Sequence, residues 1–221
     1  MLYVVATPIG NLEDITLRAI RVLGEVDFIF AEDTRVTKKL LNHLEIDKIV
    51  YRYDENVKYH QISNIINMLE NGNKIAIVTD AGTPCISDPG WELVDAAHKK
   101  GIKVVPIAGP SAMTAAASVA GISMRRFCME GFLPKKKGRQ TLLKKLAEEE
   151  RTIVIFESPH RIEKTLRDIE TFMGVKEVVI VREITKIYEE VLRGTTTELI
   201  EKISKNPLKG EIVLLIKGLE D

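Results

Sequence analysis

Three loops in the first half of this chain combine glycine and proline with side chains that carry hydroxyl or carboxylate groups. They read TPIGN from residue 7, TDAGTP from residue 79 and PIAGPS from residue 106. Glycine lets a ligand approach the backbone closely, and the hydroxyls of Thr83 and Ser111 can form hydrogen bonds with it. In open α/β sheets, the loops that leave the carboxyl ends of strands form the crevice in which ligands bind. The three loops therefore predict a ligand-binding site.

The middle loop follows the apolar run Ile75–Val78, whose β-branched residues are typical of a strand covered on both faces of a parallel sheet. We interpret Asp80 and Thr83 as functional, because similar loops occur twice more in the chain. Asp88 is interpreted as the N-cap of the next helix, with Pro89 at the first helical position, where the missing N–H costs nothing.

Alternating strands and helices in the first half must position these loops. Short apolar runs predict strands at residues 2–6, 28–31, 49–51, 75–78 and 104–105. Apolar residues at helical spacing predict helices between them, the clearest at about 58–70 with Gly72 just past its end. Asn11 or Asp14 can cap the first helix. This alternation predicts a mostly parallel sheet with helices on both faces.

The second half has elements of its own after a linker at about 121–126. Strands are predicted at 127–129, 153–156, 178–181, 188–194 and 211–217, the fourth of them at a sheet edge. Ser158 and Pro159 are the residue types that start a helix, and Thr197 can cap another. We therefore expect an α/β fold with two domains, residues 1–122 and 123–221.

The composition is that of an ordinary globular protein: 221 residues, 45% hydrophobic and 29% charged, with a formal net charge of zero. Zero net charge excludes a uniformly basic nucleic-acid binder but leaves room for a local basic patch. The N-terminus lacks a signal-peptide pattern, and no apolar run reaches membrane-spanning length. Cys85 and Cys128 are expected to be buried thiols in the cytoplasm, and the histidines lack metal-ligand spacing, so no metal site is expected.

Six sequence blocks resemble one family, although neither the dinucleotide-binding nor the Walker glycine signature occurs. The blocks are TPIGNLEDIT at 7–16, AEDTR at 31–35, TDAGTPCISDPG at 79–90, PIAGPSAMTAAA at 106–117, EGFLPKKKGR at 130–139 and FESPHRI at 156–162. In order, and over nearly the whole chain, they resemble the ribosomal RNA small subunit methyltransferase I family, a branch of the tetrapyrrole methylase fold.

The resemblance implies a reaction and an architecture. Members of this family transfer a methyl group from S-adenosylmethionine to the 2′-hydroxyl of a cytidine in small-subunit (16S) ribosomal RNA. The implied structure is two α/β domains with the cofactor in the cleft between them, usually in a homodimer. Longer members carry a further small domain after the last strand, and we expect any RNA contact made there to be absent from this chain.

The resemblance also assigns residues to the cofactor S-adenosylmethionine. They line the three loops and one strand of the second domain: Pro8, Ile9 and Gly10; Asp80, Gly82, Thr83 and Ile86; Gly109, Pro110, Ser111 and Ala112; and Phe156. Glycines that permit close approach, together with hydroxyls and an uncharged apolar wall, suit this cofactor and its adenine. Because the cofactor supplies the electrophile, the protein is expected to supply position and electrostatics.

A general base could accelerate the transfer by roughly 10²–10⁴-fold, because an alcohol is a weak nucleophile. Candidates at loop ends are Asp33, Asp54, Glu157 and His160. Each has a structural alternative: Asp33 could cap a helix, Glu157 could pair with Arg161, and His160 could be an ordinary surface histidine. We retain Asp33, Glu157 and His160 as the catalytic candidates.

Contacts to RNA are expected from a basic loop and from side chains nearer the chemistry. The basic segment contains Lys135, Lys136, Lys137 and Arg139, soon after Phe132, whose ring could stack on a base. Without that context, a lysine-rich loop is more often a solvated surface. The other expected RNA contacts are Arg35, Asp54, Asn56 and Arg161. The zero net charge favours the assembled small subunit over naked RNA as the substrate.

Two other functions stay open. A methyltransferase acting on a corrin or porphyrin precursor would have the same fold, but the glycine-rich first loop of those enzymes is replaced here by TPIGN. A non-catalytic RNA- or ribosome-binding module that kept a cofactor pocket is the other. Methyl transfer from labelled cofactor to purified small subunits separates all three.

Overall fold

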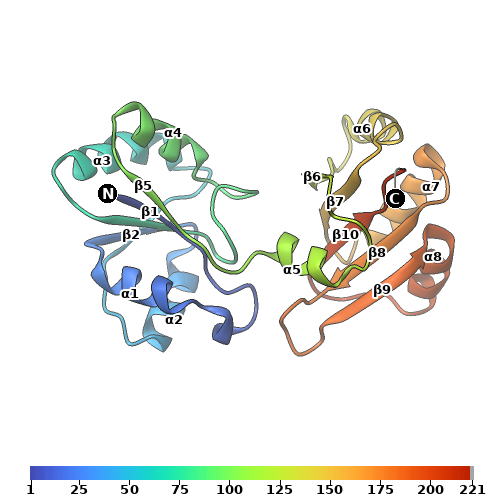
Figure 1. Cartoon of the computed structure of the whole chain (residues 1–221), viewed down its shortest axis with the longest axis horizontal. Coiled ribbons are helices and arrows are strands. Elements are labelled where there is room, and N and C mark those ends of the chain that lie inside the picture. Colours follow the sequence, from blue (N-terminus) through green and yellow to red (C-terminus); the bar gives the residue numbers. More distant parts are fainter. Residues whose placement is uncertain (220–221) are drawn as a thin grey trace. The chain divides into compact units, whose positions relative to one another are not determined.

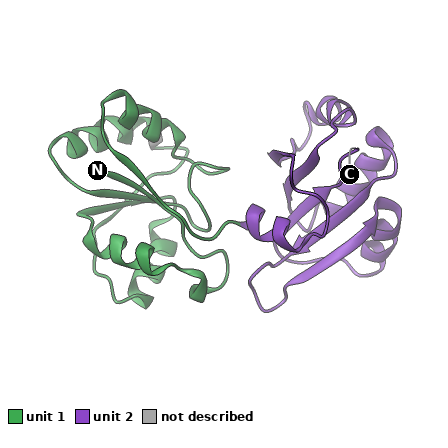
Figure 2. Ribbon diagram, in the orientation of Figure 1, with its two compact units in different colours: residues 1–111 green, residues 112–221 purple. Residues whose placement is uncertain are grey.

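Two compact units make up the chain in a computed structural model that describes residues 1–219 (Figure 2). The first unit covers residues 1–111 and the second begins at Ala112. Each is built on one five-stranded sheet. We expected the domain boundary near residue 122, but the second unit begins earlier, at Ala112. The helix Ala112–Val119 packs on the sheet of the second unit.

The first unit alternates strands and helices as the sequence predicts (Figure 1). Its strands are β1 (Leu2–Val5), β2 (Phe28–Ala31), β3 (Val50–Arg52), β4 (Ile75–Val78) and β5 (Val104–Ile107). Its helices are α1 (Leu17–Glu25), α2 (Thr34–His43), α3 (Lys58–Glu70) and α4 (Trp91–Lys99), and a short 3₁₀ helix spans Leu12–Asp14. The strand order is β3-β2-β4-β1-β5 and every pairing is parallel, which confirms the predicted parallel sheet.

Helices cover both faces of this sheet, and β4 shows why. Its side chains alternate, so Ala76 and Val78 pack with α1 and α2, whereas Ile75 and Ile77 pack with α3 and α4. All of its residues are buried, as a continuous apolar run in a central parallel strand requires. The carboxyl ends of β1, β2, β4 and β5 therefore meet at one edge of the sheet, where the predicted loops begin.

Two of the predicted helix starts in the first unit are wrong. Helix α1 begins at Leu17 and is capped by Thr16, whose hydroxyl accepts the N–H of Ala19, while Asn11 caps only the 3₁₀ helix. Helix α4 begins at Trp91, after Gly90 rather than after Asp88. Gly90 has φ 140°, and a Cβ there would lie 2.6 Å from the sulfur of Cys85, so the turn that follows Asp88 requires glycine.

The second unit contains a mixed sheet. Its strands are β6 (Phe127–Phe132), β7 (Thr152–Glu157), β8 (Glu177–Arg182), β9 (Glu190–Thr195) and β10 (Ile212–Ile216). Its helices are α5 (Ala112–Val119), α6 (Arg139–Leu146), α7 (Ile162–Met173) and α8 (Thr196–Lys205). The order is β6-β7-β10-β8-β9, with β6 parallel to β7 and the remaining pairs antiparallel, so β9 is an edge strand as predicted.

The core of the second unit lies on both faces of its sheet. Helices α6, α7 and α8 pack on one face, and α5 packs on the other through Ala116, together with Ala120 just after the helix. Two predicted caps are wrong here as well: α7 begins at Ile162 rather than next to Ser158, and Thr195 caps α8 in place of Thr197. Thr195 forms a complete capping box with Glu198, which explains the preference for the earlier threonine.

None of the helices within residues 1–219 combines the length and the apolar character that crossing a membrane requires.

Candidate functional site

The three predicted loops are joined to one another at the carboxyl edge of the first sheet. Thr7 and Gly82 form a backbone bridge, with the N–H of Thr7 donating to the Gly82 carbonyl at 2.9 Å and the reverse bond at 3.0 Å. The hydroxyl of Thr83 donates to the carbonyl of Pro110 at 3.1 Å. The loops meet because β1 lies between β4 and β5. The structure therefore holds all three loops in one arrangement.

Glycines make this close approach possible. Gly82 is buried with φ +87°, and a Cβ there would lie 3.4 Å from Cγ2 of Ile9. Gly109 is exposed, and its Cβ would lie 3.0 Å from the Cβ of Ala6. Gly82 is thus favoured by its backbone conformation and Gly109 by its tight packing against Ala6, roles additional to the close approach of a ligand that the sequence predicts.

The loop residues differ in how much of them reaches solvent. Gly10, Asp80, Ile86 and Gly109 are exposed, Ile9 and Gly82 are buried, and Pro8, Thr83, Pro110 and Ser111 are half-buried. Exposed residues Gly10 and Gly109 on two uncharged loops, with the Asp80 carboxylate on the loop after β4, offer the donors, acceptors and apolar surface that an adenosyl group with a charged amino acid end requires. These residues fit S-adenosylmethionine.

Two residues of the predicted cofactor set belong to the second unit. Ala112 is the first residue of α5, and Phe156 is half-buried near the end of β7. The ring of Phe156 lies 5.7 Å from that of the exposed Phe132, centroid to centroid, at an interplanar angle of 54°. Phe132 is thus an exposed ring at the end of β6, three residues before Lys135 in the sequence.

Asp33 lies at the start of α2 and is held by its neighbours. One of its carboxylate oxygens caps the helix by accepting the N–H of Arg35 at 2.8 Å, so the capping alternative is correct. Nε and Nη2 of Arg35 also donate to this carboxylate, at distances down to 2.6 Å. The N–H of Asp33 in turn donates to Oδ1 of Asp80 at 2.9 Å. This contact links the loops that follow β2 and β4.

The two carboxylates at this junction have opposite pKa shifts. Hydrogen bonds from the Arg35 side chain and backbone lower the pKa of Asp33 to about 2. Burial raises the pKa of Asp80, and the charges of Glu32 and Asp33 act in the same direction, whereas the hydrogen bond from the Asp33 N–H opposes them. Asp33 is therefore a weak base, suited to orienting a group or balancing a charge, while Asp80 has the higher proton affinity.

Asp54 organises its own turn. Its carboxylate pairs with Arg52 and accepts the N–H groups of Asn56 and Val57 at 3.0 and 3.1 Å. Burial alone would raise the pKa of Asp54, but these hydrogen bonds outweigh it and lower the pKa. The side chain of Asn56 is exposed beside this turn, at the end of β3, the edge strand of the first sheet.

Glu157 and His160 occupy opposite environments at the end of β7. The Glu157 side chain has no exposed surface and pairs with Arg161 at 3.3 Å, so the predicted pair is present. His160 is exposed, and its N–H donates to Oγ of Ser158 at 3.3 Å. An enclosed carboxylate does not reach solvent, where a substrate hydroxyl would have to approach, whereas His160 is exposed.

The basic loop, residues 135–138, is only part of the predicted basic segment. Lys135, Lys136 and Lys137 are exposed, as phosphate contacts must be. Arg139 is 5% exposed, and its guanidinium donates to Asp168, Thr165 and the Pro134 carbonyl. The expectation that Arg139 contacts phosphate is therefore wrong, because its donors are directed into the protein.

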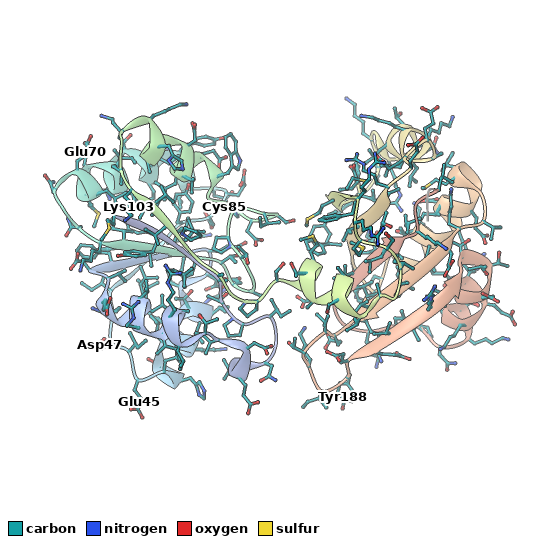
Figure 3. The ribbon with its side chains drawn as sticks, in the orientation of Figure 1. Glu45, Asp47, Glu70, Cys85, Lys103 and Tyr188 are labelled. Carbon is teal, nitrogen blue, oxygen red and sulfur yellow. The ribbon has the colours of Figure 1, made fainter. Side chains whose placement is uncertain are left out.

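Both cysteines are half-buried rather than fully buried. Burial raises the pKa of each thiol to about 11, so both are protonated at neutral pH. Cys85, labelled in Figure 3, lies in the loop after β4. Across residues 1–219, no three His, Cys, Asp or Glu side chains come together as they would to hold a metal ion.

Sequence reasoning missed two residues that shape this region. Thr7 forms the bridge to Gly82, and its buried hydroxyl donates to the Thr79 carbonyl at 3.1 Å. Thr165 is fully buried in α7, where its hydroxyl contacts both Glu157 and Arg139. A threonine among apolar helix positions was the available signal for Thr165, because a buried hydroxyl needs a partner.

Comparison with known proteins places the fold and site in a family. The family described as Tetrapyrrole (Corrin/Porphyrin) Methylases matches residues 1–200. A protein of Thermotoga maritima named Ribosomal RNA small subunit methyltransferase I is 48% identical over 219 residues, covering 99% of both chains. Proteins of the same name from Halalkalibacterium halodurans and Escherichia coli O157:H7 are 48% and 45% identical, each match covering 98% of this chain and 75% and 77% of theirs.

The chain thus belongs to the tetrapyrrole methylase family, in its ribosomal RNA small subunit methyltransferase I branch.

Proposed function

We propose that this protein transfers a methyl group from S-adenosylmethionine to the 2′-hydroxyl of a cytidine in small-subunit ribosomal RNA. The observation that carries the proposal is the junction of the three loops, in which the Thr7–Gly82 bridge and the Thr83–Pro110 hydrogen bond fix an exposed backbone surface at the carboxyl edge of the sheet. The names of the relatives support ribosomal RNA as the substrate.

The cofactor would be held by the loops that follow β1, β4 and β5. When bound, S-adenosylmethionine supplies an activated methyl group, so the protein has to bind, orient and exclude water. Ile9 and Ile86 offer apolar contact, Thr83 and Ser111 offer hydroxyls, and Asp80 offers a carboxylate for the amino group of the methionine part. Orientation of this kind can lower a barrier by up to ~7–11 kcal/mol.

Asp33 and Arg35 would act on the target nucleotide. Arg35 is largely exposed and is already paired with Asp33, so a phosphate could share its guanidinium while the Asp33 carboxylate accepts a hydrogen bond from the ribose hydroxyl. With a pKa of about 2, Asp33 stays ionised and acts by orientation rather than by storing a proton. His160, exposed at the end of β7, remains a candidate base.

The test is methyl transfer with purified components. Labelled S-adenosylmethionine is mixed with small ribosomal subunits, with free small-subunit RNA and with a porphyrin precursor. We expect label in a single ribose 2′-oxygen of the RNA, with subunits preferred over free RNA. Label in the macrocycle instead would support the corrin or porphyrin alternative, and cofactor binding without transfer to any of the three would support a non-catalytic module.

We also propose a homodimer, on the resemblance to the family. Light scattering at micromolar concentration should return twice the chain mass, and a monomer mass would reject the proposal.

A further inference from the structure

A network of side chains connects the end of β7 to the basic loop. Glu157 lies at its centre: Oε2 accepts the hydroxyl of Thr165 at 2.6 Å, and Oε1 accepts the N–H of Ser158 at 2.8 Å and pairs with Nε of Arg161. The Thr165 oxygen also accepts Nη2 of Arg139 at 2.8 Å. Glu157 therefore reaches two arginines, one directly and one through a threonine hydroxyl.

Both arginines end on the stem of the basic loop. Arg161 donates through Nη2 to the carbonyl of Leu133 at 2.8 Å, and Arg139 donates through Nη1 to the carbonyl of Pro134 at 3.3 Å. These two peptide groups directly precede Lys135. Two chains of polar contacts thus start at the Glu157 carboxylate. One runs through Arg161 to the Leu133 carbonyl, and the other runs through Thr165 and Arg139 to the Pro134 carbonyl.

The charges of the network cancel. Arg139 and Arg161 are balanced by Glu157 and by Asp168, which accepts Nε of Arg139 at 2.7 Å. The Arg139 side chain is 6% exposed and that of Glu157 is fully enclosed. A largely buried polar network whose members all have partners favours one arrangement of the groups that it touches, because a broken bond would leave an enclosed polar or charged group unsatisfied.

We propose that Glu157 and Thr165 are positioning residues that hold the basic loop ready for RNA through Arg139 and Arg161. The inference rests on the proposed function, in which Lys135, Lys136 and Lys137 contact RNA phosphates. A loop that is ordered before binding loses less conformational entropy when it binds, so anchoring its stem strengthens RNA binding. This role replaces that of a general base for Glu157.

Thr165→Val tests the connection from Glu157 through Thr165 to Arg139, because valine keeps the shape of threonine and removes the hydroxyl that joins Glu157 to Arg139. The matched control is Thr171→Val on the same helix, where the hydroxyl is exposed and donates only to the Arg167 carbonyl. Asp168→Asn, at a half-buried position, weakens the hold on Arg139 by removing the charge of its partner. This variant replaces Thr165→Val in the test if Thr165→Val fails to fold.

The first readout needs no RNA. Hydrogen exchange of the segment 133–142 should become about tenfold faster in Thr165→Val and Asp168→Asn, and should match wild type in Thr171→Val. Unchanged protection of this segment in both network variants would overturn the proposal. This readout decides on the network even if wild-type protein fails to bind small-subunit RNA, a result that would reject the proposed function instead.

The second readout is affinity for small-subunit RNA, measured with and without the triple change of Lys135, Lys136 and Lys137 to Gln. Thr165→Val should weaken binding about tenfold in the native background, or ~1.4 kcal/mol, and should have no further effect once the lysines are gone. An equal loss in both backgrounds would show that Thr165 acts elsewhere and would overturn the proposal.

Steady-state kinetics separate positioning from proton transfer at Glu157. Glu157→Gln should raise KM for the small subunit and leave kcat near wild type, while its control Glu163→Gln, which disrupts only an exposed pair with Arg167, should change neither. A fall in kcat of about 10²-fold at unchanged KM would restore the general-base role and contradict the proposal.

Discussion

Thr7 and Gly82 are joined by two reciprocal backbone hydrogen bonds, of 2.9 and 3.0 Å, although they lie 75 positions apart in the sequence. The bridge is antiparallel, unlike the parallel pairing of β1 with β4, and it lies beyond the ends of both strands. It fastens the loop that follows β1 to the loop that follows β4. The loop surface is thereby ordered before any ligand arrives, which reduces the entropy lost on binding.

Gly82→Ala should weaken both folding and cofactor binding. At φ +87° a side chain costs ~1–2 kcal/mol of stability, and the added methyl group would occupy space at the junction of the loops. We expect S-adenosylmethionine affinity, measured by calorimetry, to fall about tenfold or more. Gly101→Ala is the control: it has φ +68° and open space around it, and it precedes β5 at the other end of the sheet. Equal cofactor affinity in both variants would remove Gly82 from the site.

Asp33→Asn should lower the methylation rate by roughly 10²-fold through lost orientation of the ribose hydroxyl, while folding and cofactor affinity stay near wild type. Asparagine caps a helix about as well as aspartate, so α2 should keep its start, and the lost property is the carboxylate charge beside Arg35. Single-turnover transfer to small subunits measures the rate. Unimpaired turnover would leave Asp33 with its capping role alone.

The two linked carboxylates should shift stability in opposite directions with pH. The folded pKa of Asp33 is lowered from 3.8 to about 2, so its stabilising effect is present above pH ~4 and is lost as pH falls through 2. The folded pKa of Asp80 is raised, so its ionisation opposes folding as pH rises through that value. At pH 7, Asp80→Asn should raise the Tm and Asp33→Asn should lower it slightly.

Calorimetric unfolding between pH 3 and pH 7 measures this difference. The gain from Asp80→Asn should shrink toward pH 3, where the wild-type carboxyl is already protonated. The hydrogen bond from the Asp33 N–H should survive in the variant, because asparagine keeps the accepting oxygen. Shifts of the same sign for both variants at pH 7 would contradict the assigned pKa directions.

Changing Lys135, Lys136 and Lys137 to Gln should weaken RNA binding and flatten its salt dependence. Each lost phosphate contact removes about 0.7–0.9 from the slope of log K against log salt, so three contacts remove ~2–3. The control changes Lys99, Lys100 and Lys103 to Gln, which removes the same charge from the first unit. Lys103 (Figure 3) immediately precedes β5, at the end of the first sheet opposite to the three loops. Equal effects of the two triple variants would reduce the basic loop to a source of net charge.

Arg139→Gln should destabilise the second unit rather than merely weaken RNA binding. Removing one member of a buried ion pair costs ~3–5 kcal/mol, since the partner charge stays behind. Urea unfolding should show this loss for Arg139→Gln, whereas Lys137→Gln, at an exposed position two residues earlier, should change stability by less than ~0.5 kcal/mol. A silent Arg139→Gln would return Arg139 to the group of surface contacts.

The strands were predictable because their signal is local. Ile75–Val78 is an uninterrupted apolar run, and a run of that kind has to be buried wherever it lies. The parallel direction of the strands in the first sheet followed separately from their alternation with helices. The meeting of the three loops followed as well, because loops after parallel strands share an edge.

Helix starts and buried charges were less predictable because their causes are distant or ambiguous. Asp88-Pro89 and Ser158-Pro159 have the residue types of a helix start, but those types also form turns, and both helices begin after such a turn, at Trp91 and at Ile162. Arg139 follows three exposed lysines and looks like a fourth surface cation. Its partners Thr165 and Asp168 lie far along the chain, so only the fold reveals its burial.

The interior place of β1 in the first sheet, between β4 and β5, constrains how the chain is made. Leu2 pairs with Ile75 on one side and with Val104 on the other, so β1, which precedes the other four strands of this sheet in the sequence, waits for partners that are synthesised later. At ~5–20 residues per second, the roughly 100 residues between Val5 and Ile107 take about 5–20 s to translate. Until β4 and then β5 have been synthesised, the apolar segment Leu2–Val5 has unpaired backbone edges, so we expect it to need shielding in the newborn chain.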